Sequence, residues 1–96
     1  MLVHMVAFKY KAGVDAAVRA QHRERLRALG DLDGLIDLKV GEDVVRSGRS
    51  YDTGLVILFP DRGALDAYQK NGRHVPVAQF GAANCESIIA VDFDAA

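Results

Sequence analysis

The chain has 96 residues, half of them apolar, which suits one compact domain over residues 1–96 that buries a limited fraction of its surface. Twelve basic and thirteen acidic side chains are interspersed and give a net charge of -1. This balance argues against a nucleic-acid partner or any other polyanion.

The cysteine content and the apolar runs predict a cytoplasmic protein without a membrane partner. A single cysteine, Cys85, forms no internal disulfide and no zinc knuckle. The apolar residues 1–8 are followed by Lys9 and Lys11, which is the reverse of the layout of a signal peptide. No run approaches the roughly 20 apolar residues that cross a bilayer.

The first predicted element is a strand over residues 2–10, rich in Val, Phe and Tyr and followed by Gly13. Because side chains alternate along a strand, one face carries His4, Val6, Phe8 and Tyr10, and the other carries Val3, Met5 and Ala7. A helix follows, capped by Asp15 and stopped by Gly30, whose buried stripe comprises Val18, His22, Leu26 and Leu29.

The middle of the chain predicts two strands of different character. The segment 35–45 alternates Ile36, Leu38 and Val40 with Asp37 and Lys39, so only one of its faces is apolar. The segment 53–59 is apolar on both faces and is ended by Pro60.

The last part of the chain predicts helices and a final strand. Asp61 caps a helix that turns Ala64, Leu65 and Tyr68 inward, and Asn71-Gly72 should supply the left-handed residue that ends it. Val75-Pro76 begins a short helix through Phe80. In the strand 86–93, Ile88 and Ala90 alternate with Ile89 and Val91.

The order β-α-β-β-α-β predicts an α+β, ferredoxin-like domain with an antiparallel sheet. Its helices cover one sheet face, so the other face remains open although it is strongly apolar. An open apolar face of this size predicts a two-fold homodimer that packs sheet against sheet. The residues of this face are Val3, Met5, Ala7, Val56, Leu58, Ile89 and Val91.

Several short motifs resemble the stress-responsive A/B barrel (Dabb) family. They are the opening residues 3–10, Tyr51-Asp52, the phrase at 59–68, His74-Val75 and the closing residues 91–93. The resemblance covers nearly the whole chain and implies a dimeric α/β barrel with a pocket in each subunit between sheet and helices. The family includes plant stress proteins, bacterial proteins of unassigned function and a plant polyketide cyclase.

The resemblance also implies roles for two residues. The cyclase uses a tyrosine and a histidine six residues apart for an intramolecular aldol closure, and Tyr68 and His74 match them. His4 matches a histidine in the family's first strand, whereas Thr53 stands where the cyclase has a second pocket histidine. The family often has His-Pro at the positions of Asn71-Gly72.

The pair Tyr68 and His74 is the candidate catalytic site. A neutral His74 would take a proton from a carbon acid while the phenol of Tyr68 binds the oxyanion. In the alternative interpretation, Tyr68 packs in the core and bonds His74 for structural reasons only. For His4 and His22, the alternatives to a pocket role are a satisfied core histidine and a solvated helix edge.

We therefore expect an apolar pocket for a small hydrophobic or carbonyl compound. If there is catalysis, it is cofactor-free acid–base chemistry of the cyclase or isomerase type. The alternatives are a stress-associated binding or structural dimer without turnover, and a cofactor-independent monooxygenase. The three histidines lie on separate elements without metal-ligand spacing, so no metal is expected. The expected substrate-binding residues are His4, Val6, Phe8, His22, Leu26, Val77, Phe80, Ile88 and Ala90.

Overall fold

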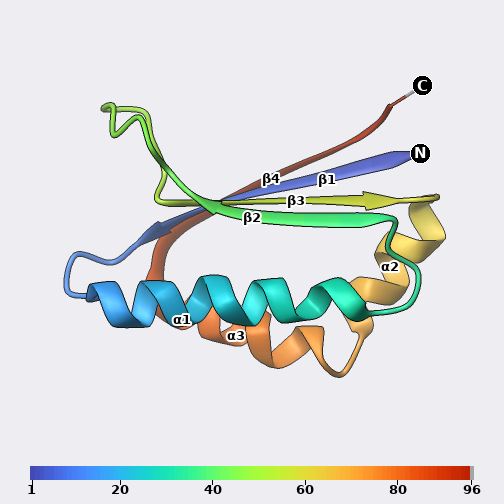
Figure 1. The fold of residues 1–96 in the computed structure, drawn as a ribbon, viewed down its shortest axis with the longest axis horizontal. Coiled ribbons are helices and arrows are strands. Elements are labelled where there is room, and N and C mark those ends of the chain that lie inside the picture. The colour runs from blue at the N-terminus through green and yellow to red at the C-terminus, as the bar shows by residue number, and fades with distance from the viewer. Residues whose placement is uncertain (96) are drawn as a thin grey trace.

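The computed structural model describes residues 1–95, which form an antiparallel sheet with helices on one of its faces (Figure 1). This confirms the predicted ferredoxin-like α+β fold. The elements in chain order are β1 (Leu2–Tyr10), α1 (Ala16–Arg27), the 3-10 turn η1 (Ala28–Asp31), β2 (Asp37–Glu42), β3 (Thr53–Phe59), α2 (Arg62–Lys70), α3 (His74–Asn84) and β4 (Cys85–Asp94).

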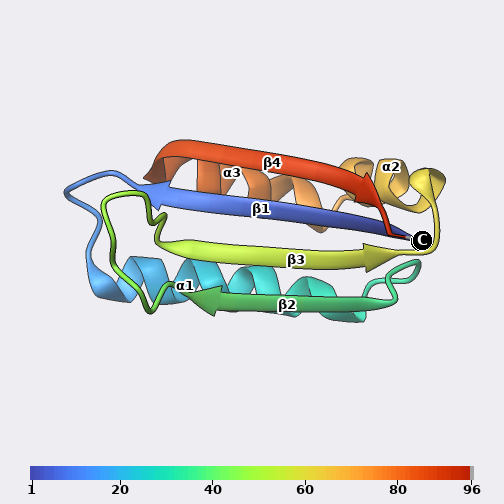
Figure 2. The ribbon, with the colours of Figure 1, turned by 90° about the horizontal axis from the view of Figure 1, so that it is seen from above.

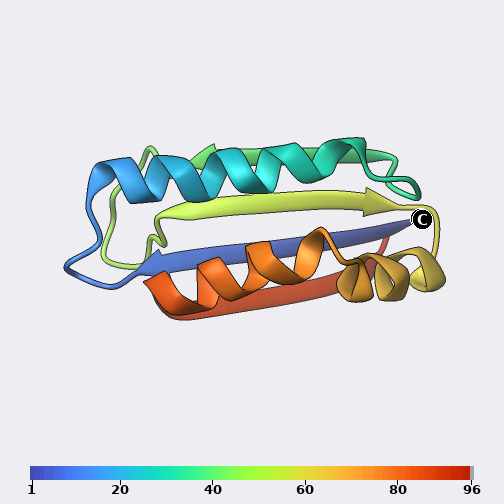
Figure 3. The same ribbon diagram turned by 90° about the horizontal axis from the view of Figure 1, so that it is seen from below.

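The sheet has the strand order β2-β3-β1-β4, with the doubly apolar strands β1 and β3 at its centre. In the register of β1, Val6 pairs with Leu55 of β3 and with Ala90 of β4, and His4 pairs with Asp92 of β4. Seen from below, α1 lies beneath β2 and β3 while α3 lies beneath β1 and β4 (Figure 3). Phe8 of β1 packs against His22 of α1 at a ring centroid distance of 4.7 Å, and it also lies beside Gly81 of α3.

The core lies between the sheet and the helices. Ile57 and Phe59 of β3 and His22 of α1 have no exposed surface, and Leu29 of η1 is 2% exposed. Burying such aliphatic and aromatic side chains contributes roughly 1.5–3 kcal/mol each to folding. Most of the predicted inward stripe of α1 therefore packs against the sheet, since His22, Leu26 and Leu29 are buried.

The opposite sheet face is open to solvent (Figure 2). Its apolar residues include Ile89 and Val91, which are 53% and 54% exposed, and Met5, Val56 and Phe93, which are also exposed. This face is as apolar as the sequence predicts, and none of the helices formed by residues 1–95 covers it.

Several predicted boundaries were wrong. The second strand spans Asp37–Glu42 rather than residues 35–45, and the short helix expected at 75–80 is the longer α3. The predicted left-handed residue after α2 is also wrong, because Asn71 is extended, with φ -63° and ψ 135°. Its backbone carbonyl accepts the N–H groups of His74 and Val75, so Asn71 links α2 directly to α3.

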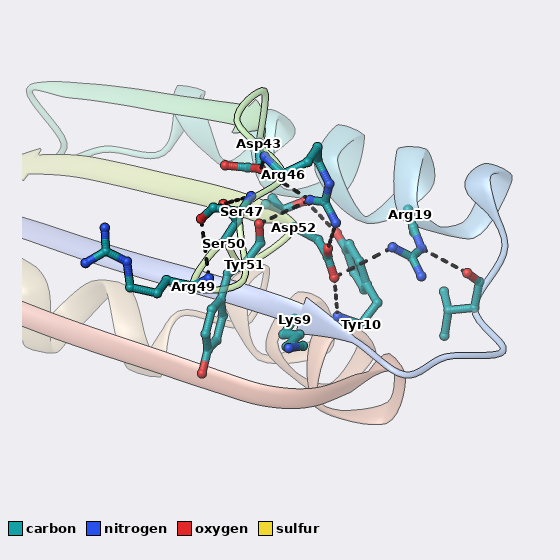
Figure 4. A network of polar contacts seen from close by, with 12 residues as sticks. Lys9, Tyr10, Arg19, Asp43, Arg46, Ser47, Arg49, Ser50, Tyr51 and Asp52 are labelled. Atoms are coloured by element: carbon teal, nitrogen blue, oxygen red, sulfur yellow. Dashed lines mark hydrogen bonds and ion pairs between the residues drawn. The ribbon is translucent and has the colours of Figure 1, made fainter.

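The loop between β2 and β3 is tied to the sheet by Asp52 (Figure 4). One oxygen of this buried carboxylate accepts the backbone N–H of Tyr10 at 2.9 Å, and the other accepts Arg46 Nη2 at 2.9 Å. Arg19 Nη1 of α1 lies 3.6 Å from the same group. These contacts fix the start of β3, where Thr53 faces the helices.

Candidate functional site

A cavity of about 140 Å³ lies between the sheet and the helices, with mostly apolar walls. The structure brings together every expected site residue there except Phe80 and Ala90. Leu55 and Ala78 also line it, although the sequence did not single them out. The lining residues are His4, Val6, Phe8, His22, Leu26, Leu55, Tyr68, His74, Val77, Ala78 and Ile88.

Phe80 and Ala90 lie outside this cavity. Phe80 is on α3, and its ring stacks on that of His22 at a centroid distance of 5.9 Å. The guanidinium carbon of Arg25 lies 4.2 Å from the centroid of the Phe80 ring. Ala90 pairs with Val6, but it is exposed because β4 is an edge strand. Phe80 therefore supports a wall of the cavity, and Ala90 borders the open face of the sheet.

Tyr68 and His74 are in direct contact. Their ring centroids are 4.3 Å apart with an interplanar angle of 39°, and no packed side chain separates them. The contact is between rings, because the Tyr68 hydroxyl has no hydrogen-bond partner in the described chain. His74 Nδ1 lies 3.3 Å from the carbonyl oxygen of Gln69, which makes Nδ1 the donor and leaves Nε2 unprotonated.

The surroundings hold both groups in their neutral forms. Burial raises the pKa of Tyr68 to about 12, so the phenol remains a hydrogen-bond donor at neutral pH. Burial also lowers the pKa of His74, although the Gln69 carbonyl acts in the opposite direction, and the nearby His4 lowers it further. A neutral imidazole beside a protonated phenol is the arrangement that proton abstraction requires.

His4 has a carboxylate partner. Its Nδ1 donates to Asp92 of the neighbouring strand β4, and its ring lies 6.3 Å from that of Tyr68. This bond fixes which nitrogen of the buried His4 ring faces β4. His4 is therefore a second imidazole with a defined orientation at the Tyr68 end of the cavity.

His22 belongs to a different set of hydrogen bonds. The Tyr10 hydroxyl lies 2.7 Å from His22 Nδ1 and 2.9 Å from Thr53 Oγ1. Arg23 Nη1 donates to the same Thr53 oxygen at 3.4 Å. The His22 ring packs edge-on against Phe8 at 4.7 Å, and its Nε2 has no partner in the described chain.

Three further features of residues 1–95 bear on metal binding, thiol chemistry and membrane insertion. No three His, Cys, Asp or Glu side chains in this part of the chain gather as a metal site. Cys85 is buried, and burial raises the pKa of its thiol, which disfavours the nucleophilic thiolate. No helix in the same range is both long and apolar enough to cross a membrane.

Asp92, Tyr10 and Thr53 are the functional candidates that sequence reasoning missed. Alternation along the last strand does place Asp92 on the face of Ile88 and Ala90. That Asp92 lies opposite His4 depends on the register between β1 and β4, which no local pattern specifies. The sequence showed that Thr53 replaces the second pocket histidine of the cyclase, but it did not show that the Thr53 hydroxyl bonds the Tyr10 hydroxyl.

Solved structures with the same fold have different functions. A dimeric ferredoxin-like protein of unknown function from Thermobifida fusca is 21% identical with a TM-score of 0.90, and the alignment covers 98% of this chain and 90% of that one. A hydroxynitrile lyase from Passiflora edulis is 14% identical with a TM-score of 0.85, covering 96% and 90% of the two chains. At these identities the likeness shows the fold alone.

A third similar structure is described as a Dabb family protein. It comes from Mesorhizobium loti, is 18% identical with a TM-score of 0.81, and the alignment covers 99% of this chain and 96% of that one. None of the curated proteins matches this chain by sequence. The family model of the stress responsive A/B barrel domain matches residues 2–95, and the chain therefore belongs to the Dabb family.

Proposed function

We propose that this protein is a homodimer that holds a small apolar carbonyl compound in the cavity and moves a proton at the carbon beside the carbonyl, without a cofactor. The observation that carries this proposal is the buried hydroxyl of Tyr68, which has no hydrogen-bond partner among residues 1–95, next to the neutral imidazole of His74 and close to the ring of His4. A buried donor without a partner costs about 1–3 kcal/mol. A ligand oxygen would remove that penalty.

In this proposal His74 is the base and Tyr68 stabilises the oxyanion. His74 Nε2 takes the proton from carbon, the electron pair of the C–H bond forms the carbon–carbon double bond of the enolate, and the π pair of the carbonyl moves onto its oxygen, to which the Tyr68 O–H donates. The resulting imidazolium returns the proton to carbon or to oxygen. The reaction is then an isomerisation or the enolisation that begins an aldol closure.

His4 and Asp92 give the same end of the cavity a second proton acceptor. The Asp92 carboxylate accepts from Nδ1 of His4 and so fixes the orientation of the ring. We propose that His4 returns or relays the proton that His74 removes. Comparing His74→Ala with His4→Ala distinguishes the two roles, because the base is the residue whose loss stops proton removal.

The volume of the cavity limits the ligand. An apolar cavity of about 150 Å³ is known to hold benzene. The cavity here is about 140 Å³, so a ring of six atoms with one or two oxygens is the largest ligand that fits without movement of the walls. A long polyketide chain would need the cavity to open.

The test is proton exchange at carbon. The protein in D₂O should exchange α-protons of cyclohexanone, or of other small ketones and β-keto thioesters, faster than buffer does, as followed by NMR. His74→Ala should lower the exchange rate about 10²–10⁴-fold, because positioned general bases contribute that much. Tyr68→Phe should lower it less.

A matched control is Tyr51→Phe, which removes a phenol that bonds Ser87 at 2.7 Å and does not line the cavity. This variant should exchange protons at the parent rate. If the parent does not accelerate exchange, the catalytic proposal is abandoned.

Binding without turnover is the second candidate function. It is favoured by one observation, which is that Tyr68 and His74 touch through their rings without a hydrogen bond between them. Native mass spectrometry of protein purified from cells would then show a bound small molecule, while exchange assays show no activity.

A further inference from the structure

The cavity holds a second buried donor besides Tyr68. Within residues 1–95, the buried side-chain polar atoms without a hydrogen-bond partner are His22 Nε2 and the Tyr68 hydroxyl, and both residues line the same cavity. His22 has no exposed surface, and Tyr68 is 4% exposed. Since buried polar groups are nearly always paired, two such atoms on residues that line one cavity need a common explanation.

The hydrogen bonds around His22 decide which of its nitrogens carries the proton. The Arg23 guanidinium is a donor and never an acceptor, so Thr53 Oγ1 accepts its hydrogen bond. The Thr53 hydroxyl can then donate to the Tyr10 oxygen, and the Tyr10 hydroxyl in turn donates to His22 Nδ1. The opposite direction leaves the Thr53 hydroxyl hydrogen without an acceptor and His22 Nε2 without a donor. The first arrangement satisfies one more group, and it leaves an N–H on Nε2.

His22 is neutral under ordinary conditions. Burial lowers its pKa to about 4, and the charges of Arg23 and Arg25 act in the same direction. The Nε2–H group is therefore a neutral donor, like the phenol of Tyr68. Two neutral donors in an apolar cavity match carbonyl oxygens better than a carboxylate, whose charge would be desolvated there.

There is space beside Nε2 because residue 81 is glycine. A Cβ atom at Gly81 would lie only 3.0 Å from His22 Nε2. Glycine inside a helix is unfavourable relative to alanine, and Gly81 has no positive φ that would require it. The absence of a side chain at Gly81 thus keeps the surroundings of Nε2 open.

Tyr68 of α2 and His22 of α1 contact different residues of β1. Tyr68 packs against His4 at a centroid distance of 6.3 Å, whereas His22 packs against Phe8 at 4.7 Å. His4 and Phe8 are separate positions on the same face of β1, so the two donors belong to different parts of the cavity lining. The wall between them is formed by Val6 and by other apolar side chains.

We propose that the ligand of this cavity is a small dicarbonyl compound, with one oxygen bound by Tyr68 at the reacting end and a second oxygen bound by His22 Nε2–H at the other end of an apolar body. This inference rests on the proposed function and adds the class of substrate. His22 is a binding residue for the non-reacting oxygen, and Tyr10 and Thr53 fix its tautomer. The carbonyls explain both unpartnered donors at once.

The experiment compares two probes that share a six-membered ring, cyclohexane-1,4-dione and cyclohexanone, by NMR titration. A second hydrogen bond contributes about 1–1.4 kcal/mol, so the parent protein should bind the dione about five- to tenfold more tightly than cyclohexanone. His22→Phe keeps an aromatic ring but removes the donor. It should abolish the preference for the dione, so that this variant binds the two probes with about equal affinity.

Gly81→Ala tests the same point with the histidine in place. The added methyl group would occupy the space beside Nε2, so this variant should also lose the preference for the dione while it retains exchange activity toward cyclohexanone. It carries the test if His22→Phe does not fold.

The other outcomes are also decisive. If the parent has no preference for the dione, or if both variants keep the preference, an ordered water rather than a ligand oxygen satisfies His22, and the inference is wrong while the proposed function stands. If neither probe binds at millimolar concentration and no exchange occurs, both the inference and the proposed function are wrong.

Discussion

At the scale of single residues, burial controls protonation in this protein. His22, His74 and Tyr68 are all held in neutral forms because the charged forms would lose hydration inside the domain. His22 has no acidic group against it, since its neighbours are Arg23 and Arg25 on its own helix, Tyr10 on β1 and Phe80 on α3. Its neutrality therefore contributes to the pH dependence of folding.

We expect the free energy of unfolding to fall as the pH is lowered from about 6.5 to about 4. The pKa of His22 is about 4 in the folded protein and about 6.5 when unfolded, so between these values the unfolded state binds the extra proton. His74 acts in the same direction. Urea unfolding at a series of pH values measures this slope, and His22→Phe should flatten it. An unchanged slope in that variant would contradict the assignment.

At the scale of elements, the loop between β2 and β3 depends on one carboxylate. Burial by itself would raise the pKa of Asp52, but the hydrogen bond from Tyr10 N–H, the bond from Arg46 and the charge of Arg19 outweigh it, so the pKa lies below its usual value. Asp52 thus orders the residues immediately before Thr53 (Figure 4). Arg46, at φ 54°, adopts the left-handed conformation that this loop requires.

Asp52→Asn should destabilise the protein by about 2 kcal/mol, because hydrogen bonds to a charged group contribute roughly 1.5–3 kcal/mol and the neutral amide keeps only one of the two acceptor oxygens. Asp43→Asn is the matched control, since Asp43 bonds the same Arg46 from a more exposed position. Urea denaturation of both variants measures the difference. Equal losses in the two variants would show that Asp52 is no more than a loop residue.

Connections between elements were the least predictable part of the chain. Asn71-Gly72 is typical of a left-handed helix end, yet the carbonyl of Asn71 instead starts α3 by accepting the N–H groups of His74 and Val75. The local sequence permits both arrangements. The packing of α3 under β1 and β4 selects the one that turns His74 toward Tyr68 (Figure 3).

At the scale of the whole molecule, the open sheet face is the largest feature that the single chain leaves unexplained. It carries a continuous set of exposed apolar side chains on strands β1, β3 and β4. Similar structures include dimeric ferredoxin-like proteins. These two facts support the homodimer in our proposal, with the two sheets packed face to face.

Light scattering at micromolar concentration should therefore give the mass of a dimer. Ile89→Asp should convert it to monomers, because a charge would be buried in the interface without a partner. Ile36→Asp is the matched control, since Ile36 is 51% exposed and Ile89 is 53% exposed, but Ile36 precedes β2 and does not lie on the open face. A parent protein that is monomeric under these conditions would refute the sheet-to-sheet dimer.

The sequence by itself determined the element types, the ferredoxin-like order, the two apolar faces of the sheet and most residues of the cavity. These depend on periodicity and on caps such as Asp15 and Asp61, which are local properties that a single chain displays directly. The pairing of Tyr68 with His74 was also visible, because only six residues separate them.

Only the tertiary structure decided which polar groups meet across the sheet and helices. Asp92 reaches His4 through the β1–β4 register, and Tyr10 joins His22 to Thr53 across three elements. Phe80 lies behind His22 and not in the cavity because α3 continues past it to Asn84. Such contacts join residues 12 to 88 positions apart, and their geometry follows from register and packing, which no local sequence pattern specifies.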